Sequence, residues 1–168
     1  MARRSTTSIF VRAHLYGVLV IGAFVVVLPL AVMRLDRVVP IQISTGFSYA
    51  GYPLFALCGC LSYWSFVVLI TIGRGTAFPA DPPTRFVAAG PYRWVRNPMY
   101  IGNLGMILAV SVLWRSPAVM GYFLALCVVA DRYVALVEEP KLVERFGPGY
   151  EAYRRAVRRW IPRLPATR

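Results

Sequence analysis

The sequence predicts an all-α integral membrane protein, in which four transmembrane helices are followed by a C-terminal amphipathic helix at the membrane interface. Composition is the first reason, because apolar residues make up 58% of the chain and charged residues 15%, whereas soluble domains average roughly 45–50% and about 25%. Long apolar runs are the second reason, and the placement of basic residues around these runs is the third. The length fits one domain, residues 1–168.

Two apolar runs predict transmembrane helices most clearly. Residues 15–33 and 47–72 contain no charged side chain, and each is close to the length of about 20 residues that crosses the hydrocarbon core of a bilayer. Two further runs, residues 98–114 and 117–137, are less clean, since the first is short and the second carries a charged pair near its end. Together the four runs predict four spans.

The last two runs predict a helical hairpin. Only Arg115 and Ser116 separate them, and so short a connection makes neighbouring helices antiparallel. Both outer ends of the hairpin therefore return to the same side of the membrane. Arg96 precedes the first helix and Glu138 follows the second, so we expect these two residues to lie near each other.

Basic residues predict the orientation of the chain in the membrane. They gather before the first run, between the second and third runs and after the fourth, whereas the opposite side carries only Arg34, Arg37 and Arg115. The positive-inside rule then places both termini and the loop 73–97 in the cytoplasm. Because the net charge of +12 lies mainly beside the membrane, its expected partner is anionic lipid and not nucleic acid.

The loop 73–97 and the C-terminal segment 138–168 have different patterns. Glycines and prolines interrupt the loop and exclude one continuous helix, while the aromatic residues between them favour a loop folded against the bundle. In the C-terminal segment, apolar side chains recur at helical spacing opposite several arginines, which predicts an amphipathic interfacial helix that could also cover a site. Its apolar positions are Phe146, Tyr150, Tyr153, Val157 and Trp160.

Cysteine and histidine do not indicate a metal site. Cys58, Cys60 and Cys127 all fall within apolar runs, where thiols behave as small apolar side chains. The single histidine, His14, lies at the start of the first run. We therefore predict no bound metal and no disulfide framework.

The start of the third run has the features of an anion site. Asn97 followed by Pro98 predicts a helix start, with Asn97 as the N-cap and Pro98 at the first helical position. Free backbone N–H groups and the positive end of the helix dipole would then lie beside Arg93 and Arg96. A ligand carboxylate or phosphate fits this arrangement. The alternative is that Asn97 and Pro98 only start the helix while the arginines meet lipid phosphates.

The end of the fourth run carries acidic residues. Asp131 and Glu138 are seven residues apart in the sequence and share one helix face. Charged groups at membrane depth tend to face a bundle interior or a watery cavity, and for Asp131 with Arg132 a structural ion pair is the favoured interpretation. Glu138 and Glu139 lie nearer the surface, where they suit a cationic or hydroxyl-rich ligand. S-adenosylmethionine has the carboxylate, the cationic groups and the ribose diol that the two clusters could bind.

These motifs also resemble a known family. Residues 90–102, which read Gly-Pro-Tyr-Arg-Trp-Val-Arg-Asn-Pro-Met-Tyr-Ile-Gly, are followed by the Glu138–Glu139 pair and by Phe146-Gly147. This order closely resembles the isoprenylcysteine carboxyl methyltransferase and phospholipid methyltransferase family over the second half of the chain. The loop from Gly75 to Pro83 looks like a bacterial branch of that family, which implies the bacterial plasma membrane.

The resemblance implies an integral membrane enzyme that transfers methyl groups from S-adenosylmethionine to a lipophilic acceptor. It implies that the last two spans and the C-terminal segment bind the cofactor, and we predict that Arg96, Glu138 and Arg154 act on or orient the acceptor. Family members usually carry histidine at the position of Asn97. Asparagine cannot titrate, so no base is expected there. The implied cofactor-binding residues are Arg93, Arg96, Asn97, Pro98, Tyr100, Gly102, Glu138 and Glu139.

The acceptor stays open at this point. An ionised carboxylate or another ready nucleophile needs no base, whereas an ammonium acceptor must first lose a proton, which Glu138, Glu139 or a tyrosine could take. The alternatives are therefore a phospholipid amine or a thiol as the acceptor. A different alternative is a non-enzymatic membrane scaffold or partner subunit whose basic tail binds anionic lipids. The sequence does not indicate an oligomeric state.

Overall fold

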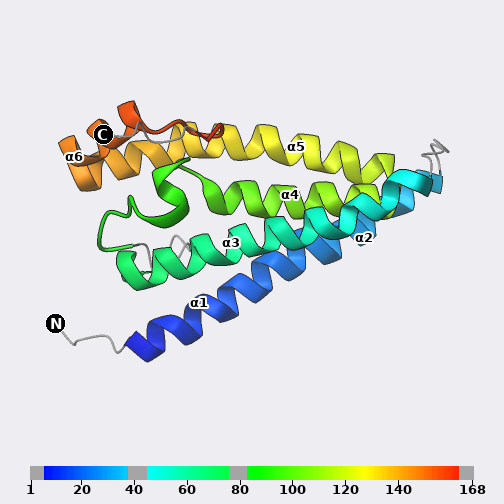
Figure 1. The fold of residues 1–168 in the computed structure, drawn as a ribbon, viewed down its shortest axis with the longest axis horizontal. Helices are drawn as coiled ribbons and strands as arrows, with labels where there is room; N and C mark the ends of the chain where they lie inside the picture. Colours follow the sequence, from blue (N-terminus) through cyan, green and yellow to red (C-terminus); the bar gives the residue numbers. More distant parts are fainter. Residues whose placement is uncertain (1–5, 38–44, 76–82, 163–168) are drawn as a thin grey trace.

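Helical rods lie along the long axis of the molecule (Figure 1). The structure is a computed structural model that describes residues 6–37, 45–75 and 83–162. Within these residues the elements are helical and are joined by short turns and one irregular loop. The all-α prediction is therefore confirmed for this part of the chain.

The first rod contains a wide turn that a proline explains. It begins with helix α1 (Thr6–Ile21), continues through a π-helical turn (Gly22–Val27) into α2 (Leu28–Val32) and ends in a 3₁₀ turn (Met33–Arg37). Pro29 lacks an N–H and its ring would clash with the carbonyl four residues earlier in a regular helix. The preceding N–H, that of Leu28, bonds five residues back to the carbonyl of Ala23 instead.

Helices α3 (Gly51–Gly73) and α4 (Pro98–Leu113) pack closely because glycines of α4 face α3. A Cβ atom added to Gly102 would lie 2.7 Å from the backbone oxygen of Cys58. One added to Gly105 would overlap the Cys58 side chain. The two backbones thus approach to a distance that only glycine permits. Inside this contact, the Ser62 hydroxyl donates to Asn103 Oδ1 at 2.7 Å.

The predicted hairpin between α4 and α5 (Pro117–Tyr133) is confirmed. Arg115 takes a left-handed conformation with φ of 51°, and Ser116 caps α5 by accepting a bond from the N–H of Val119. Asp36, at the end of the first rod, accepts a second bond at 2.9 Å from the N–H of Ala118. This end of the bundle is therefore held by hydrogen bonds to the start of α5.

The last rod runs further than predicted. Helix α5 continues through a π-helical turn (Val134–Glu138) into α6 (Glu139–Ala156), with an irregular residue at Gly147. The helix therefore continues past residue 137, where the predicted span ends, into the segment predicted as a separate interfacial helix. As with Pro29, the cause of the π turn is a proline, Pro140, because the N–H of Glu139 bonds back to the carbonyl of Val134.

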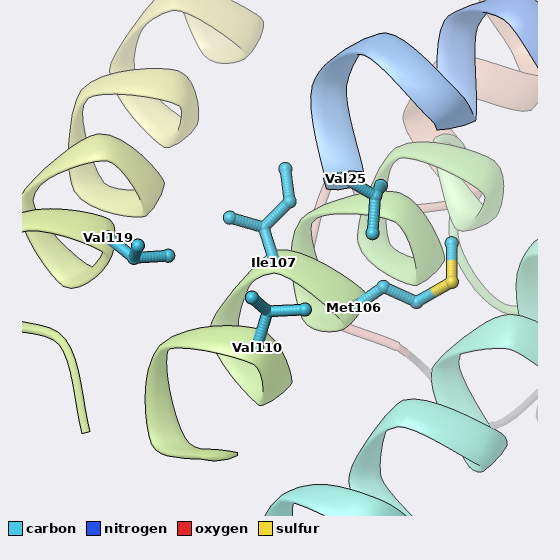
Figure 2. Close-up of a cluster of buried hydrophobic side chains, with 5 residues drawn as sticks. All are labelled: Val25, Met106, Ile107, Val110 and Val119. Atoms are coloured by element: carbon cyan, nitrogen blue, oxygen red, sulfur yellow. The ribbon is translucent and has the colours of Figure 1, made fainter. Parts of the chain in front are cut away.

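The core is a cluster of apolar side chains from three rods (Figure 2). Ile107 of α4 is 2% exposed and lies between Val25 of the first rod and Val119 of α5 in this view. Met106 and Val110 complete the cluster from α4. Elsewhere, large apolar side chains cover the outer surfaces of the rods, as for Val18 and Leu57.

Among the residues that the structure describes, three helices are long and apolar enough to cross a membrane: Phe10–Arg37, Thr45–Gly73 and Pro117–Ala156. Helix α4 is apolar but shorter, with 16 residues. The helical stripe expected to reach Trp160 stops early, because α6 ends at Ala156 and Val157 is extended. Of the predicted loop, residues 76–82 lie outside the described part of the chain, as do residues 163–168.

Candidate functional site

The start of α4 and the junction of α5 with α6 meet at one end of the bundle, where the irregular loop also lies (Figure 1). The expected proximity is confirmed by two contacts. Arg96 Nη1 lies 2.8 Å from Glu139 Oε1, and the Tyr100 hydroxyl donates to Glu138 Oε2 at 3.1 Å. The wide turn before Pro140 presents both glutamates to α4.

Arg159 joins the acidic residues of this end into one network. Its Nε and Nη2 donate to Glu139 Oε1 and Oε2, both at 2.9 Å, and its Nη1 donates to Asp131 Oδ1 at 3.1 Å. The hydrogen bonds that Arg159 donates to Glu139 raise the pKa of its guanidinium further above its usual range. Such forked contacts fix both position and orientation.

The segment after α6 folds back over the start of α4. The backbone N–H of Arg96 donates to the carbonyl of Arg158 at 2.9 Å, and Asn97 Nδ2 donates to the carbonyl of Arg159 at 3.3 Å. Trp160 Nε1 donates to Asp131 Oδ1 at 2.8 Å, and its ring meets the edge of Tyr100. We call residues 157–160 the C-terminal strap, since these bonds hold it across the cluster.

Glu138 differs from its neighbour Glu139 in its partners. Its hydrogen-bond partner is the neutral hydroxyl of Tyr100, and within the described residues it forms no ion pair. Glu139, by contrast, is 4% exposed and contacts two guanidinium groups. The two glutamates therefore have different roles. Glu139 binds Arg96 and Arg159, whereas the Oε1 atom of Glu138 can accept a hydrogen bond from a further group.

Arg96 keeps one free donor, Nε, despite its burial. Its side chain is 11% exposed. It forms an ion pair with Glu139, but the N–H does not point along the line to the carboxylate oxygen, so the contact is not a hydrogen bond. Its Nε atom is buried and has no hydrogen-bond acceptor within the described residues, whereas the buried Nη1 faces Glu139 Oε1 at 2.8 Å. Unsatisfied buried donors are rare and call for an explanation.

Aromatic side chains close the site toward the loop. Phe86 of the loop contacts the rings of Phe146, Tyr150 and Tyr153, which lie on one face of α6. The Tyr153 hydroxyl donates to the carbonyl of Tyr92 at 2.7 Å. Burial, together with the charge of Glu138 and the nearby Tyr153, raises the pKa of Tyr92 well above its usual range. The loop is thus folded against the bundle, as its aromatic residues predicted.

The structure brings together most of the predicted site residues. Arg96, Asn97, Tyr100, Glu138 and Glu139 lie in the cluster or bond to the strap. Pro98 is buried at the first position of α4, as predicted. The backbone of Asn97 starts the helix, but its side chain makes no capping bond and reaches the strap instead. The prediction that the Asn97 side chain caps the helix is therefore wrong.

Three predicted site residues lie away from the cluster. Gly102 faces α3 and serves its packing. Arg93 and Arg154 are exposed, and in the described chain no ion pair joins them to the acidic residues. The expected pairing of Asp131 with Arg132 is also wrong, since the partners of Asp131 are Arg159 and Trp160.

Sequence reasoning missed Arg159 as a site residue. Four arginines lie in the short stretch 154–159, and nothing in the pattern distinguishes one from the others. Trp160 was a partial indication of the strap. The sequence pattern predicted that its side chain packs on the apolar face of a helix, whereas Trp160 lies after the end of α6. The strap could be found only from the fold, which returns the chain to α4.

A separate hollow lies at the opposite end of the bundle. It has a volume of about 430 Å³, and its lining is apolar, with no titratable side chain. In the described residues, no group of three or more histidine, cysteine or acidic side chains could hold a metal ion. The charged cluster is thus the place where chemistry-bearing side chains converge. The hollow is lined by Phe47, Ser48, Ala50, Leu54, Ser111, Val112, Ser116, Pro117 and Met120.

Comparison with known proteins gave one finding. Residues 47–149, well over half of the chain, match the family model described as phospholipid methyltransferase. Searches of curated proteins and of solved structures gave no match. The matched range contains α3, α4, α5 and the glutamate pair, but it ends before the C-terminal strap.

Proposed function

We propose that the chain, which belongs to the phospholipid methyltransferase family, transfers a methyl group from S-adenosylmethionine to a lipophilic acceptor within the membrane. One observation carries the choice of methyl donor. The free Nε donor of buried Arg96 and the Glu138 carboxylate, which has no ion pair within the described residues, belong to one cluster. An anion receptor and a cation receptor side by side suit a zwitterionic ligand.

The methionine end of S-adenosylmethionine fits these two groups. Its α-carboxylate matches the guanidinium of Arg96, whose Nε has no hydrogen-bond acceptor within the described residues and whose positive charge suits a carboxylate. Its α-ammonium matches Glu138. Tyr100 would keep Glu138 oriented through the existing hydrogen bond, and Asn97 would hold the strap over the ligand. When bound, this ligand supplies an electrophilic methyl group.

The proposed orientation has four spans, with α4 as the third. At 16 residues and about 1.5 Å per residue, α4 is about 24 Å long, a few ångströms short of the hydrocarbon core of about 30 Å. One end of α4 would then lie within the hydrocarbon core and not reach the head-group layer. The basic residues around the charged cluster support placing it, with both termini, at the cytoplasmic face of a bacterial plasma membrane. The proposal places the polar face of α6 at the interface.

The proposed acceptor is a carboxylate or another group that is nucleophilic without a base. Methyl transfer needs the acceptor atom held about 3–3.5 Å from the methyl carbon in a site from which water is excluded. Asn97 cannot take a proton. The positions of Arg154 and Arg93 at this end of the bundle suit an anionic acceptor head group. An amine acceptor would need Glu138 to take its proton, because the raised pKa of Tyr92 keeps that hydroxyl protonated.

Calorimetric titration with S-adenosylhomocysteine tests the proposed donor. Purified protein in lipid nanodiscs is expected to bind this product, and Arg96→Ala and Glu138→Ala should each weaken binding at least about tenfold, since a hydrogen bond to a charged group contributes about 1.5–3 kcal/mol. Lys141→Ala is the matched control, because Lys141 is exposed on α6. Binding that is unchanged in both site variants would contradict the proposal.

A labelling experiment identifies the acceptor. Cells with and without the gene, fed methionine labelled in its methyl group, would yield lipid extracts that differ in a methyl ester, a methylated amine or a thioether. A non-enzymatic scaffold predicts no labelled lipid and no binding of S-adenosylhomocysteine. The two measurements therefore separate the acceptor classes from each other and from the scaffold alternative.

A further inference from the structure

The hollow at the end of the bundle away from both termini (Figure 1) is apolar although three serines line it. Ser48 and Ser111 donate their hydroxyls to carbonyls three residues back, each at 2.7 Å, and the Ser116 hydroxyl accepts a backbone N–H at the start of α5. Each hydroxyl thus has a local backbone partner. The volume of about 430 Å³ lies in the range of about 300–1,000 Å³ for small-molecule sites. Such a hollow suits an alkyl chain and does not suit water or a polar ligand.

The hollow opens on the outer surface of the bundle. Phe47, one of its lining residues, is 76% exposed. The rings of Tyr49 and Trp114, which are close to lining residues in the sequence, are also exposed. Tryptophan and tyrosine gather where the hydrocarbon core of a bilayer meets its head groups. The mouth of the hollow therefore faces the level at which acyl chains join head groups.

Three arginines, the only basic residues predicted on this side, lie beside the mouth. Arg115 directly precedes the lining residues at the start of α5. The other two, Arg34 and Arg37, flank Asp36. Asp36 Oδ1 accepts the N–H of Ala118 at 2.9 Å, which brings this turn to the start of α5. The three arginine side chains are exposed and form no ion pair within the described residues, so this end of the bundle is positively charged.

The length of α4 gives Arg115 a reason to bind an anion. With α4 as a span, its length of about 24 Å is about 6 Å less than the hydrocarbon thickness of about 30 Å. If Pro98 lies at the cytoplasmic boundary, the backbone of Arg115 then lies inside the hydrocarbon of the opposite leaflet. A guanidinium stays charged there and is costly unless it reaches phosphates or water. A lipid phosphate drawn toward the hollow would provide that contact.

We propose that this end of the bundle binds one anionic phospholipid of the surrounding bilayer, with an acyl chain in the hollow and its phosphate against Arg115. Arg34 and Arg37 add positive charge, which favours a head group with net negative charge over a zwitterionic one. The apolar lining and the adjacent cation match the two parts of such a lipid. The inference rests on α4 as a membrane span, and it does not depend on the chemistry of the charged cluster at the other end.

Photo-crosslinking tests the inference on the full chain in phosphatidylcholine nanodiscs. The probes are phosphatidylglycerol and phosphatidylcholine, each added in trace amount and carrying the same photoreactive diazirine in one acyl chain. Labelling of residues 111–120, which include lining positions, is divided by labelling around Val18, which is 71% exposed on α1. This ratio should be about fivefold higher for phosphatidylglycerol, as expected for one arginine beside an anionic lipid.

Substitutions test the head-group contact and the chain contact separately. Arg115→Gln should lower the ratio for phosphatidylglycerol about fivefold, to that of phosphatidylcholine. Arg74→Gln is the matched control, because Arg74 is also exposed, follows the end of α3 and has the same φ of 51°. It should behave as the wild type does. Ala50→Phe adds a ring at a lining position and should reduce labelling of the hollow by both lipids.

The outcomes separate this inference from the proposed function. Equal ratios for the two lipids in the wild type would overturn the inference, and so would equal ratios for phosphatidylglycerol in Arg115→Gln and Arg74→Gln. Arg115→Lys keeps the charge and should retain the preference, which covers the case that Arg115→Gln does not fold. Absence of labelling at the hollow, because a second copy of the chain or nothing occupies it, would also overturn the inference. The proposed function is unaffected by these results, since it is tested by the titration with S-adenosylhomocysteine.

Discussion

The Arg159 guanidinium holds the Glu139 carboxylate with two nitrogen atoms, Nε and Nη2, each at 2.9 Å. The contact joins the C-terminal strap to the glutamate pair, and the Arg159 backbone carbonyl accepts a bond from Asn97 at the same time. One residue therefore ties the strap to both sides of the site. The neighbouring Arg158 has the same chemistry but an exposed side chain.

Arg159→Ala is expected to release the strap and weaken ligand binding. The variant leaves Asp131 and Trp160 without the cation between them and frees Glu139 from one of its two partners. We expect the affinity for S-adenosylhomocysteine to fall at least about tenfold, since breaking a partly buried charged contact costs about 1.5–3 kcal/mol. Arg158→Ala is the control and should bind as the wild type does.

Arg159→Lys sharpens the same prediction. Lysine keeps the charge but is a point donor that cannot reproduce the forked contact to both glutamate oxygens. Limited proteolysis should therefore cut near residue 157 faster in both Arg159 variants than in Arg158→Ala. Equal protection in all three variants would show that Arg159 does not hold the strap.

Gly102→Ala is expected to separate α3 from α4. The added Cβ would lie 2.7 Å from the backbone of Cys58 and from that of Ser62, and neither backbone can move without shifting its helix. Forcing such an overpacked contact costs about 1–3 kcal/mol, which thermal unfolding in detergent would detect. Gly121→Ala is the matched control, because a Cβ there meets no atom within 4 Å. A Gly102→Ala protein as stable as Gly121→Ala would contradict the close packing.

Ile107→Ala is expected to destabilise the bundle centre. The side chain is 2% exposed and packs between rods (Figure 2), and its truncation leaves a cavity that costs about 2–5 kcal/mol in well-packed cores. Leu124→Ala removes a similar volume from a side chain that is 56% exposed on α5. Denaturant unfolding in mixed micelles should show a clearly larger loss for Ile107→Ala, and equal losses would exclude this cluster as the core.

Tyr153→Phe tests the bond between α6 and the loop. The hydroxyl donates to the carbonyl of Tyr92 at 2.7 Å, and its removal leaves a carbonyl in a buried region without that donor, which costs about 1–3 kcal/mol. Tyr133→Phe, at an exposed position, should have no measurable effect. Hydrogen exchange at the loop residues 90–95 should accelerate only in Tyr153→Phe. Unchanged exchange would assign the loop position to ring packing alone.

The sequence predicted the hairpin and the meeting of its ends because both follow from chain connectivity. A connection as short as Arg115-Ser116 makes helices antiparallel, and Arg96 and Glu139 then fall at one end whatever the details of packing. The start of α4 at Pro98 was predictable for a similar reason, since proline tolerates only a few helix positions. These features depend on local rules and on chain length.

Side-chain partners were not predictable to the same degree. Asn97 has the chemistry of a capping residue, yet its amide bonds to a carbonyl that is 62 positions away in the sequence. Gly102 belongs to the motif that carries the resemblance, yet it faces a neighbouring helix. Asp131 prefers Arg159 to the adjacent Arg132 because the strap returns across the bundle, and no local pattern encodes that return.

The π turn ahead of Pro140 sets the angular phase of everything downstream. Each residue advances a regular helix by about 100°, so the one extra residue held in the wide turn rotates α6 by about that angle relative to a straight continuation of α5. Deleting a single residue within Val134–Glu138 would thus leave the rod nearly as long as before. It would nevertheless turn Tyr150 and Tyr153 away from Phe86 and carry the strap past α4, so this short stretch tolerates substitution far better than a change of length.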